Sequence, residues 1–144
     1  MATSTGRMTA MALAAALALT SVAAASVESD EHRQAIEAAE AWLALIDAGE
    51  FDDSWEAAAD YFKSVVKKEQ WRDMMAAVRG PLGDVLSREL TSAEYRTTLP
   101  GAPDGEYVVI QFATSFEHKR SAVETVTPMR DRDGTWRVSG YFIR

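Results

Sequence analysis

The chain has 144 residues but no cysteine and only two histidines. The absence of cysteine excludes disulfide bonds, thiolate metal ligands and a thiol nucleophile, so the hydrophobic core must stabilise the fold alone. It also excludes a bacterial lipoprotein anchor, which needs a cysteine at the cleavage point. His32 and His118 belong to no His-x-x-x-His pair and no carboxylate cluster at ligand spacing, so we expect no metal site and no cofactor.

The N-terminus also lacks an apolar run long enough to span a membrane. Its longest run, Ala10–Leu19, is about half of the roughly 20 residues that spanning requires. Arg7 precedes this run, and small residues follow it at 22–25. This order predicts a cleavable signal peptide over residues 1–25, cut between Ala25 and Ser26, and a mature domain over residues 26–144. The alternative is a membrane anchor. With cleavage, we expect a periplasmic or secreted protein that has no membrane contact.

Basic residues are outnumbered, with 15 Lys and Arg against 22 Asp and Glu, a net charge of −7. Cleavage would remove Arg7 and make the mature domain more acidic still. An acidic surface favours solubility and repels phosphate backbones and anionic lipids. Nucleic acid is therefore not an expected partner.

Three amphipathic segments in the N-terminal half predict helices. The first runs from about Asp30 to Ala48, where Gly49 ends it. The second follows a cap at Asp53, and the third ends at Gly80-Pro81. Their apolar faces carry, in order, Ala35, Ala39, Trp42, Leu43 and Ile46, then Trp55, Ala58, Ala59, Phe62 and Val66, then Trp71, Met74, Met75 and Val78.

The C-terminal half alternates with the period of strands. We expect strands over residues 85–99 (with a bulge near Leu90–Ala93), 107–117, 121–130 and 135–143. Asp133-Gly134 predicts a tight hairpin before the last strand, whose alternation sets Trp136, Val138 and Phe142 on one face. Helices followed by an antiparallel meander define the α+β class, with three N-terminal helices packed on a four-stranded sheet in one domain.

Nine short segments stand in a fixed order along the chain: Asp47–Trp55, Phe62-Lys63, Trp71, Arg79–Gly83, Ser87-Arg88, Leu99–Tyr107, Thr114–Phe116, Glu124–Val126 and Trp136–Tyr141. Together they resemble the domain-of-unknown-function 4019 family of bacterial exported proteins. The resemblance covers essentially all of residues 30–144 and implies no established activity. More loosely, the chain resembles the nuclear transport factor 2-like (cone-shaped) and cystatin-like folds, which host enzymes and binding modules alike and so do not fix a function.

One arrangement in the sequence is compatible with catalysis. Cone-shaped relatives with isomerase-type activity place a carboxylate and a phenol in an apolar cavity, where burial raises the carboxyl pKa toward that of a useful base. Glu124 is the candidate carboxylate, with Tyr95 or Tyr107 as candidate phenols. The alternative places Glu124 on the outer face of the sheet, paired with Arg137 or Lys119 across strands. There is no Gly-x-Ser-x-Gly elbow and no phosphate-binding glycine loop.

Ligand binding without catalysis is the leading hypothesis, because caps, turns and core account for the sequence signals. Trp55, Gln111 and Tyr141 are weak candidates for a ligand site, although large aromatic residues at such spacings more often belong to the core. We therefore expect a non-enzymatic domain of the bacterial cell envelope that binds a small molecule or a protein. An isomerase- or hydratase-like enzyme and a self-associating domain, possible as a homodimer, are the two alternatives.

Overall fold

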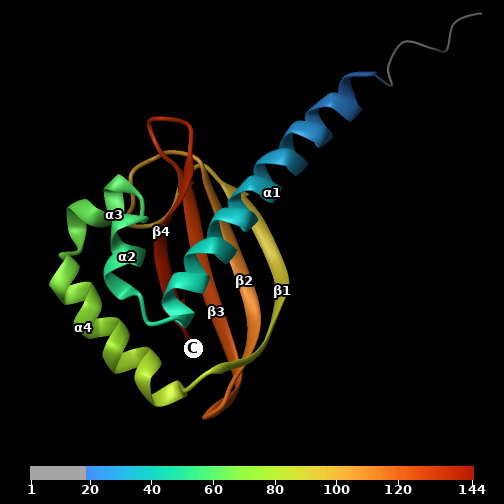
Figure 1. The fold of residues 1–144 in the computed structure, drawn as a ribbon. Coiled ribbons are helices and arrows are strands. Elements are labelled where there is room, and N and C mark those ends of the chain that lie inside the picture. Colours follow the sequence, from blue (N-terminus) through green and yellow to red (C-terminus); the bar gives the residue numbers. More distant parts are fainter. Residues whose placement is uncertain (1–18) are drawn as a thin grey trace, which may run out of the picture.

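The computed structural model describes residues 19–144, with side chains from residue 30 onward. Helices come first and an antiparallel sheet second, which confirms the α+β class (Figure 1). The sheet is a meander in the order β1-β2-β3-β4. The elements are α1 (Leu19–Asp47), α2 (Phe51–Glu56), α3 (Asp60–Val65), α4 (Lys68–Arg79), the 3₁₀ turn η1 (Gly80–Leu82), β1 (Val85–Arg96), β2 (Tyr107–Phe116), β3 (Lys119–Arg130) and β4 (Trp136–Ile143).

Helix α1 is longer than its amphipathic pattern predicts. Its described part reaches back to Leu19 rather than ending near Asp30, because the alanine-rich segment before Ser26 has high helix propensity. The predicted cleavage point therefore lies inside α1, while residues 1–18 of the predicted signal peptide lie outside the described residues. The predicted stop is confirmed, since Gly49 adopts a φ of 74° just beyond the helix.

The prediction that one continuous helix follows Asp53 is wrong. The chain forms two short helices, α2 and α3, separated by Ala57–Ala59. The break has a tertiary cause: the backbone N–H of Ala59 leaves the helical pattern and donates to the carbonyl of Val138 on β4, at 2.8 Å. Asp53 lies inside α2 rather than at its cap, and Glu50, which does precede α2, makes no capping bond with its side chain.

Two of the four register shifts in the sheet decide which side chains in the middle of β1 and at the end of β4 face the helices. The predicted bulge in β1 is confirmed between Leu90 and Ser92. The sequence pattern does not reveal the second, in β4, where Thr127 pairs with Gly140 and Pro128 with Val138, so that Ser139 is the extra residue. This shift turns Tyr141 toward the helices. The expectation that Phe142 shares the face of Trp136 and Val138 is therefore wrong, and Phe142 is 55% exposed.

The helices pack on one face of the sheet, and α1 crosses it diagonally (Figure 1). Ser54 joins the helices inside this core. Its carbonyl accepts a hydrogen bond from Trp42 Nε1 at 2.8 Å, and its Oγ accepts one from Trp71 Nε1 at 2.9 Å. The core side chains are Ala35, Ala39, Trp42, Leu43, Ile46, Ala58, Phe62, Trp71, Met75, Val108, Ile110, Phe112, Val126, Trp136 and Val138.

Replacing Ser54 with alanine is expected to lower the free energy of unfolding by about 1–3 kcal/mol, because the buried indole N–H of Trp71 loses its acceptor. Urea unfolding followed by tryptophan fluorescence measures the change. Ser64→Ala is the matched control: its exposed hydroxyl bonds only to the carbonyl of Tyr61, and its loss is expected to stay within about 0.5 kcal/mol. Equal losses in the two variants would contradict the role of Ser54.

Candidate functional site

The structure brings together two of the six candidate residues, Glu124 and Tyr141. Glu124 on β3 faces the helices and is fully buried, and the hydroxyl of Tyr141 on β4 donates a hydrogen bond to its Oε2. The alternative, in which Glu124 lies on the outer face and pairs with Arg137 or Lys119, is therefore wrong. Arg137 pairs instead with Asp133 and Asp131 in the following hairpin.

The other four candidates lie apart from this pair. Tyr95 donates to Oε1 of Glu106 at 3.2 Å, and Tyr107 donates to the carbonyl of Pro103 at 2.5 Å. Burial raises the pKa of both phenols. Trp55 packs beside the helical core and donates to the carbonyl of Val66, whereas Gln111 lies on the face of the sheet opposite the helices.

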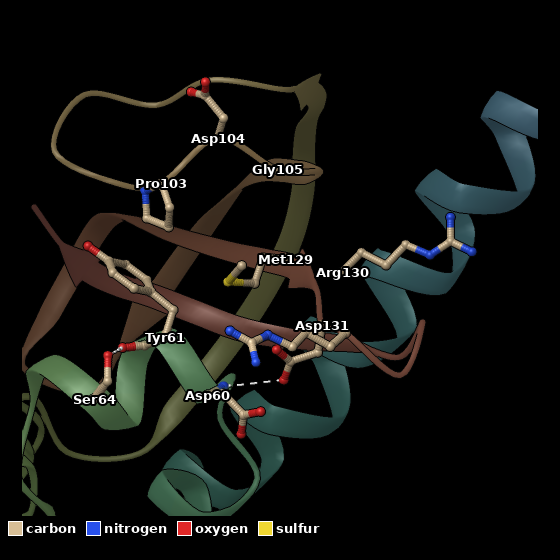
Figure 2. A pocket seen from close by; sticks show the side chains of 10 residues that line it. Asp60, Tyr61, Ser64, Pro103, Asp104, Gly105, Met129, Arg130 and Asp131 are labelled. Atoms are coloured by element: carbon tan, nitrogen blue, oxygen red, sulfur yellow. Dashed lines mark hydrogen bonds between the residues drawn. The ribbon is translucent and has the colours of Figure 1, made fainter.

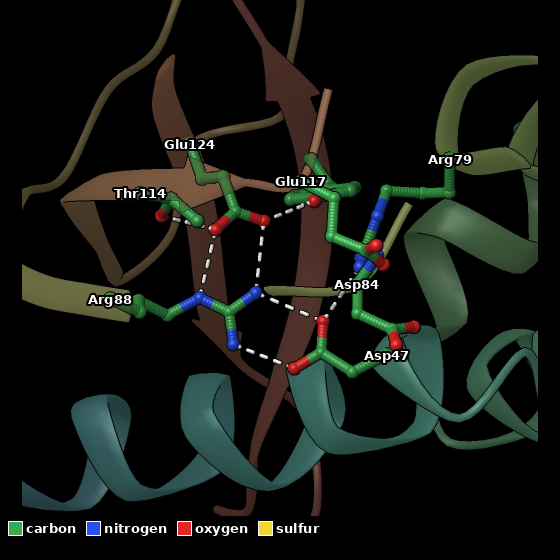
Figure 3. A network of polar contacts seen from close by, with 8 residues as sticks. Asp47, Arg79, Asp84, Arg88, Thr114, Glu117 and Glu124 are labelled. Carbon is green, nitrogen blue, oxygen red and sulfur yellow. Dashed lines mark hydrogen bonds and ion pairs between the residues drawn. The ribbon is translucent and has the colours of Figure 1, made fainter. Parts of the chain in front are cut away.

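Glu124 is held by side chains from the three other strands (Figure 3). Arg88 of β1 donates through Nε to Oε1 at 2.8 Å and through Nη2 to Oε2 at 3.2 Å. Thr114 of β2 donates to Oε1 at 2.5 Å, and Tyr141 of β4 donates to Oε2. Each carboxylate oxygen therefore accepts two hydrogen bonds.

A second carboxylate, Asp47 at the end of α1, extends the cluster to the helices (Figure 3). It accepts hydrogen bonds from Arg88 Nη1 at 2.7 Å, from Arg88 Nη2 at 3.0 Å and from Arg79 Nη2, at the end of α4, also at 3.0 Å. Two carboxylates thus alternate with two guanidinium groups. We call these six residues, Asp47, Arg79, Arg88, Thr114, Glu124 and Tyr141, the buried polar network.

The electrostatics of the network favour fixed charges. Burial opposes ionisation of Asp47, but its bonds to Arg88 and Arg79 outweigh burial and lower its pKa. Burial alone would lower the pKa of Arg88, but its hydrogen bonds to Asp47 and Glu124 outweigh burial and raise it. Burial and the neighbouring carboxylate of Glu124 both raise the pKa of Tyr141, which keeps the phenol protonated as a donor.

This geometry does not suit a general base. A base needs a carboxylate oxygen that can reach a substrate proton, and its pKa must lie near the working pH. Both oxygens of Glu124 already accept hydrogen bonds from Arg88, Thr114 and Tyr141, so neither is left free to take a proton from a substrate. The arrangement is chemically suited to fastening strands and helices together.

A hollow of about 560 Å³ lies at another part of the domain, between α3, the loop before β2 and the turn after β3 (Figure 2). Tyr61 and Ser64 contribute from α3, and Met129 at the end of β3 lies between the loop at Pro103–Gly105 and Asp131. Neither Glu124 nor Tyr141 lines it. The lining residues are Asp60, Tyr61, Ser64, Pro103, Asp104, Gly105, Met129, Arg130, Asp131 and Arg132.

Charges of both signs line this hollow. Asp131 is committed to the fold, since its Oδ2 accepts from the backbone N–H of Asp60 and from Arg137 Nη1, each at 3.2 Å. Arg130 pairs with Glu31 and Glu106. Among the described side chains, Asp104 and Arg132 make no ion pair, and both are exposed. One negative and one positive group therefore remain available to a ligand.

The profile of a family described as a protein of unknown function (DUF4019) matches residues 38–141, well over half of the chain. The chain belongs to this family. No curated protein and no solved structure matches it. All six residues of the buried polar network lie within the matched part of this DUF4019 domain.

Sequence reasoning missed four members of the network: Asp47, Arg79, Arg88 and Thr114. A signal for them was present, because all six members fall in the segments that carry the family resemblance. What was lacking was their pairing, because Arg88 and Glu124 are separated by 36 positions in the chain. Periodicity alone cannot bring such distant residues together.

The described part of the DUF4019 domain offers no cluster of three or more His, Cys, Asp or Glu side chains that could hold a metal ion. His32 lies partly buried on α1, and His118 is exposed in the turn between β2 and β3. Among the helices of residues 19–144, none combines the length and the apolarity needed to cross a membrane.

Replacing Glu124 with glutamine is expected to lower the free energy of unfolding of the DUF4019 domain by about 1.5–3 kcal/mol, because Arg88 keeps Asp47 but loses one of its two charged partners. Tyr141→Phe removes one donor to the same carboxylate and is expected to cost about 1.5–3 kcal/mol. Chemical denaturation measures both changes.

Glu94→Gln is the control for these variants, because Glu94 forms an exposed ion pair with Arg96 on the same sheet. Its loss is expected to stay below about 1 kcal/mol. A Glu124→Gln variant as stable as this control would show that the network does not fasten the fold.

Proposed function

We propose that the DUF4019 domain is a non-enzymatic binding module of the bacterial cell envelope, and that the hollow in Figure 2 takes a small zwitterionic ligand such as a short peptide. The observation that carries this proposal is the pair of opposite charges on the wall of the hollow. Asp104 and Arg132 are uncommitted among the described side chains, so one can take an ammonium group and the other a carboxylate.

The remaining lining fits such a ligand. Tyr61 has its hydroxyl committed to the carbonyl of Gly101 at 3.0 Å, which fixes the ring at the edge of the hollow. Met129 is 9% exposed and offers an adaptable apolar surface beneath it. Binding sites commonly combine apolar lining with a few polar groups that orient the ligand, and the volume lies in their usual range.

The hydrogen bonds of Glu124 support the non-enzymatic part of the proposal. The isomerase- or hydratase-like alternative requires a buried carboxylate whose oxygens face a substrate. Glu124 is buried beside a phenol, as that alternative expects, but Arg88, Thr114 and Tyr141 occupy both of its oxygens. A substrate would have to displace these donors from a carboxylate that supports four strands.

Location in the cell envelope rests on the predicted signal peptide over residues 1–25. Cleavage after Ala25 would shorten α1 from its N-terminal end. The described core residues of α1 begin at Ala35, so none of them would be lost. The mature domain over residues 26–144 would keep its core and its buried polar network.

Titration with the dipeptide alanyl-alanine is expected to move the amide resonances of Tyr61, Asp104, Gly105 and Arg132 in nuclear magnetic resonance spectra. N-acetylated and C-amidated alanyl-alanine each lack one charge and are expected to bind more weakly. Asp104→Asn and Arg132→Gln should each weaken binding about two- to fivefold, the range expected for one exposed ion pair.

Asp73→Asn, a neutralised exposed residue on α4, is the matched control and should leave the affinity unchanged. If none of the three peptides moves resonances around the hollow, the proposed ligand class is wrong. Equal binding of all three peptides would remove the role assigned to the two charges.

Mass spectrometry of the protein exported by a bacterium that expresses the full chain is expected to find Ser26 at the N-terminus. A start at a neighbouring position would leave the proposal standing, because small residues occupy positions 22–26. Intact Met1 in the membrane fraction would overturn both cleavage and release into the envelope.

A further inference from the structure

The face of the sheet opposite the helices carries a pattern that the proposed ligand hollow does not use. The helical core lies on the other side of the sheet, and Tyr61 of α3 and the loop before β2 cover only one end of this face, at Tyr107 and Met129. The strand register places residues from all four strands in transverse rows across it. We call it the open face, and two of its rows lie away from the covered end.

The first row runs Glu89, Ala113, Val123 and Arg144. Glu89 pairs with Ala113, Ala113 pairs with Val123, and Val123 exchanges backbone hydrogen bonds with Arg144. An acidic side chain therefore stands at the β1 edge, a basic one stands at the β4 edge, and small apolar residues lie between them. Glu89 and Arg144 make no ion pair with any described side chain, and both are exposed.

The second row runs Ser92, Gln111, Thr125 and Phe142. A small residue stands at the β1 edge, and a phenylalanine that is 55% exposed stands at the β4 edge. Thr125 is only 4% exposed although no helix covers it, so side chains pack closely at the centre of the face. Its Oγ1 has no hydrogen-bond partner among the described atoms.

Both rows are self-complementary under one symmetry operation. The operation is a two-fold rotation about an axis that runs parallel to the strands, between β2 and β3, in the plane between two facing sheets. It places each row opposite the same row of a second copy, in reversed order. Glu89 then faces Arg144 of the other copy, and Ser92 faces Phe142. Gln111 faces Thr125. Each of these matches occurs twice.

We propose that the open face is the interface of a homodimer of this chain, in which the sheets pack face to face about that axis. Four strands at a spacing of ~4.8 Å and a free length of roughly 25–30 Å give a flat footprint of about 500–600 Å². Side-chain relief brings the buried area of each copy toward the ~800 Å² that stable interfaces need. The dimer does not depend on the proposed ligand.

The alternative occupants of this face fit the pattern less well. An acidic partner would meet Glu89, and a basic partner would meet Arg144. Only a partner with the same two charges in reverse order satisfies both, and a second copy supplies that order by symmetry. Within one copy Glu89 and Arg144 stand at opposite edges of a four-stranded sheet, roughly 14 Å apart, and cannot pair.

Analytical ultracentrifugation of the mature protein, over a concentration series, tests the dimer. We expect a dimer whose dissociation constant rises at least about 100-fold in Phe142→Glu, because a charge replaces the large apolar side chain that faces Ser92. Met74→Glu is the matched control, since Met74 is 46% exposed on α4 and away from the open face. Circular dichroism checks that both variants fold.

Charge reversal tests the register. Glu89→Arg and Arg144→Glu alone should each weaken the dimer about tenfold or more, and the double variant should recover most of the loss. Recovery requires contact between copies, because the two side chains cannot meet within one. A monomeric wild-type protein, a Phe142→Glu variant as dimeric as Met74→Glu, or a double variant without recovery would each overturn the proposed dimer.

Discussion

The buried ion pair between Glu124 and Arg88 is the constraint around which the rest of this domain is arranged. Glu124 has no solvent contact, so its charge must be balanced by partners inside the protein. Those partners come from β1, β2 and β4, and Arg88 passes the connection on to Asp47 at the end of α1. One carboxylate therefore fixes the register of every strand and the position at which α1 meets the sheet.

The buried ion pair contributes more to selecting one strand register and one position of α1 than to the stability of the fold. Burying ions costs several kcal/mol each, and their mutual attraction offsets this cost only when the geometry is good. Both oxygens of Glu124 accept two bonds, and Arg88 bonds to two carboxylates, so most of this cost is offset. A sheet that slipped by one residue would leave these charges unpaired. It would also turn the apolar side chains of the slipped strand away from the core.

The same network separates the scaffold of the domain from its proposed binding surfaces. Glu124 and Tyr141 have the composition of a catalytic acid and phenol, but their hydrogen bonds connect the strands of the sheet. The hollow beside α3 and the open face of the sheet leave charges and apolar side chains uncommitted among the described residues. The bulge at Ser139 contributes to both parts, because it turns Tyr141 inward to Glu124 and Phe142 outward.

The sequence by itself determined the order of helices and strands, the bulge in β1, the stop at Gly49 and the family, because these depend on local propensity and on ordered short segments. The break between α2 and α3 and the inward direction of Glu124 and Tyr141 were decided only by the tertiary structure. The first depends on a hydrogen bond from Ala59 to β4, and the second depends on a bulge and on Arg88, 36 positions away. A period of two shows that a strand has two faces, but it cannot say which face will hold a charge whose partner lies far along the chain.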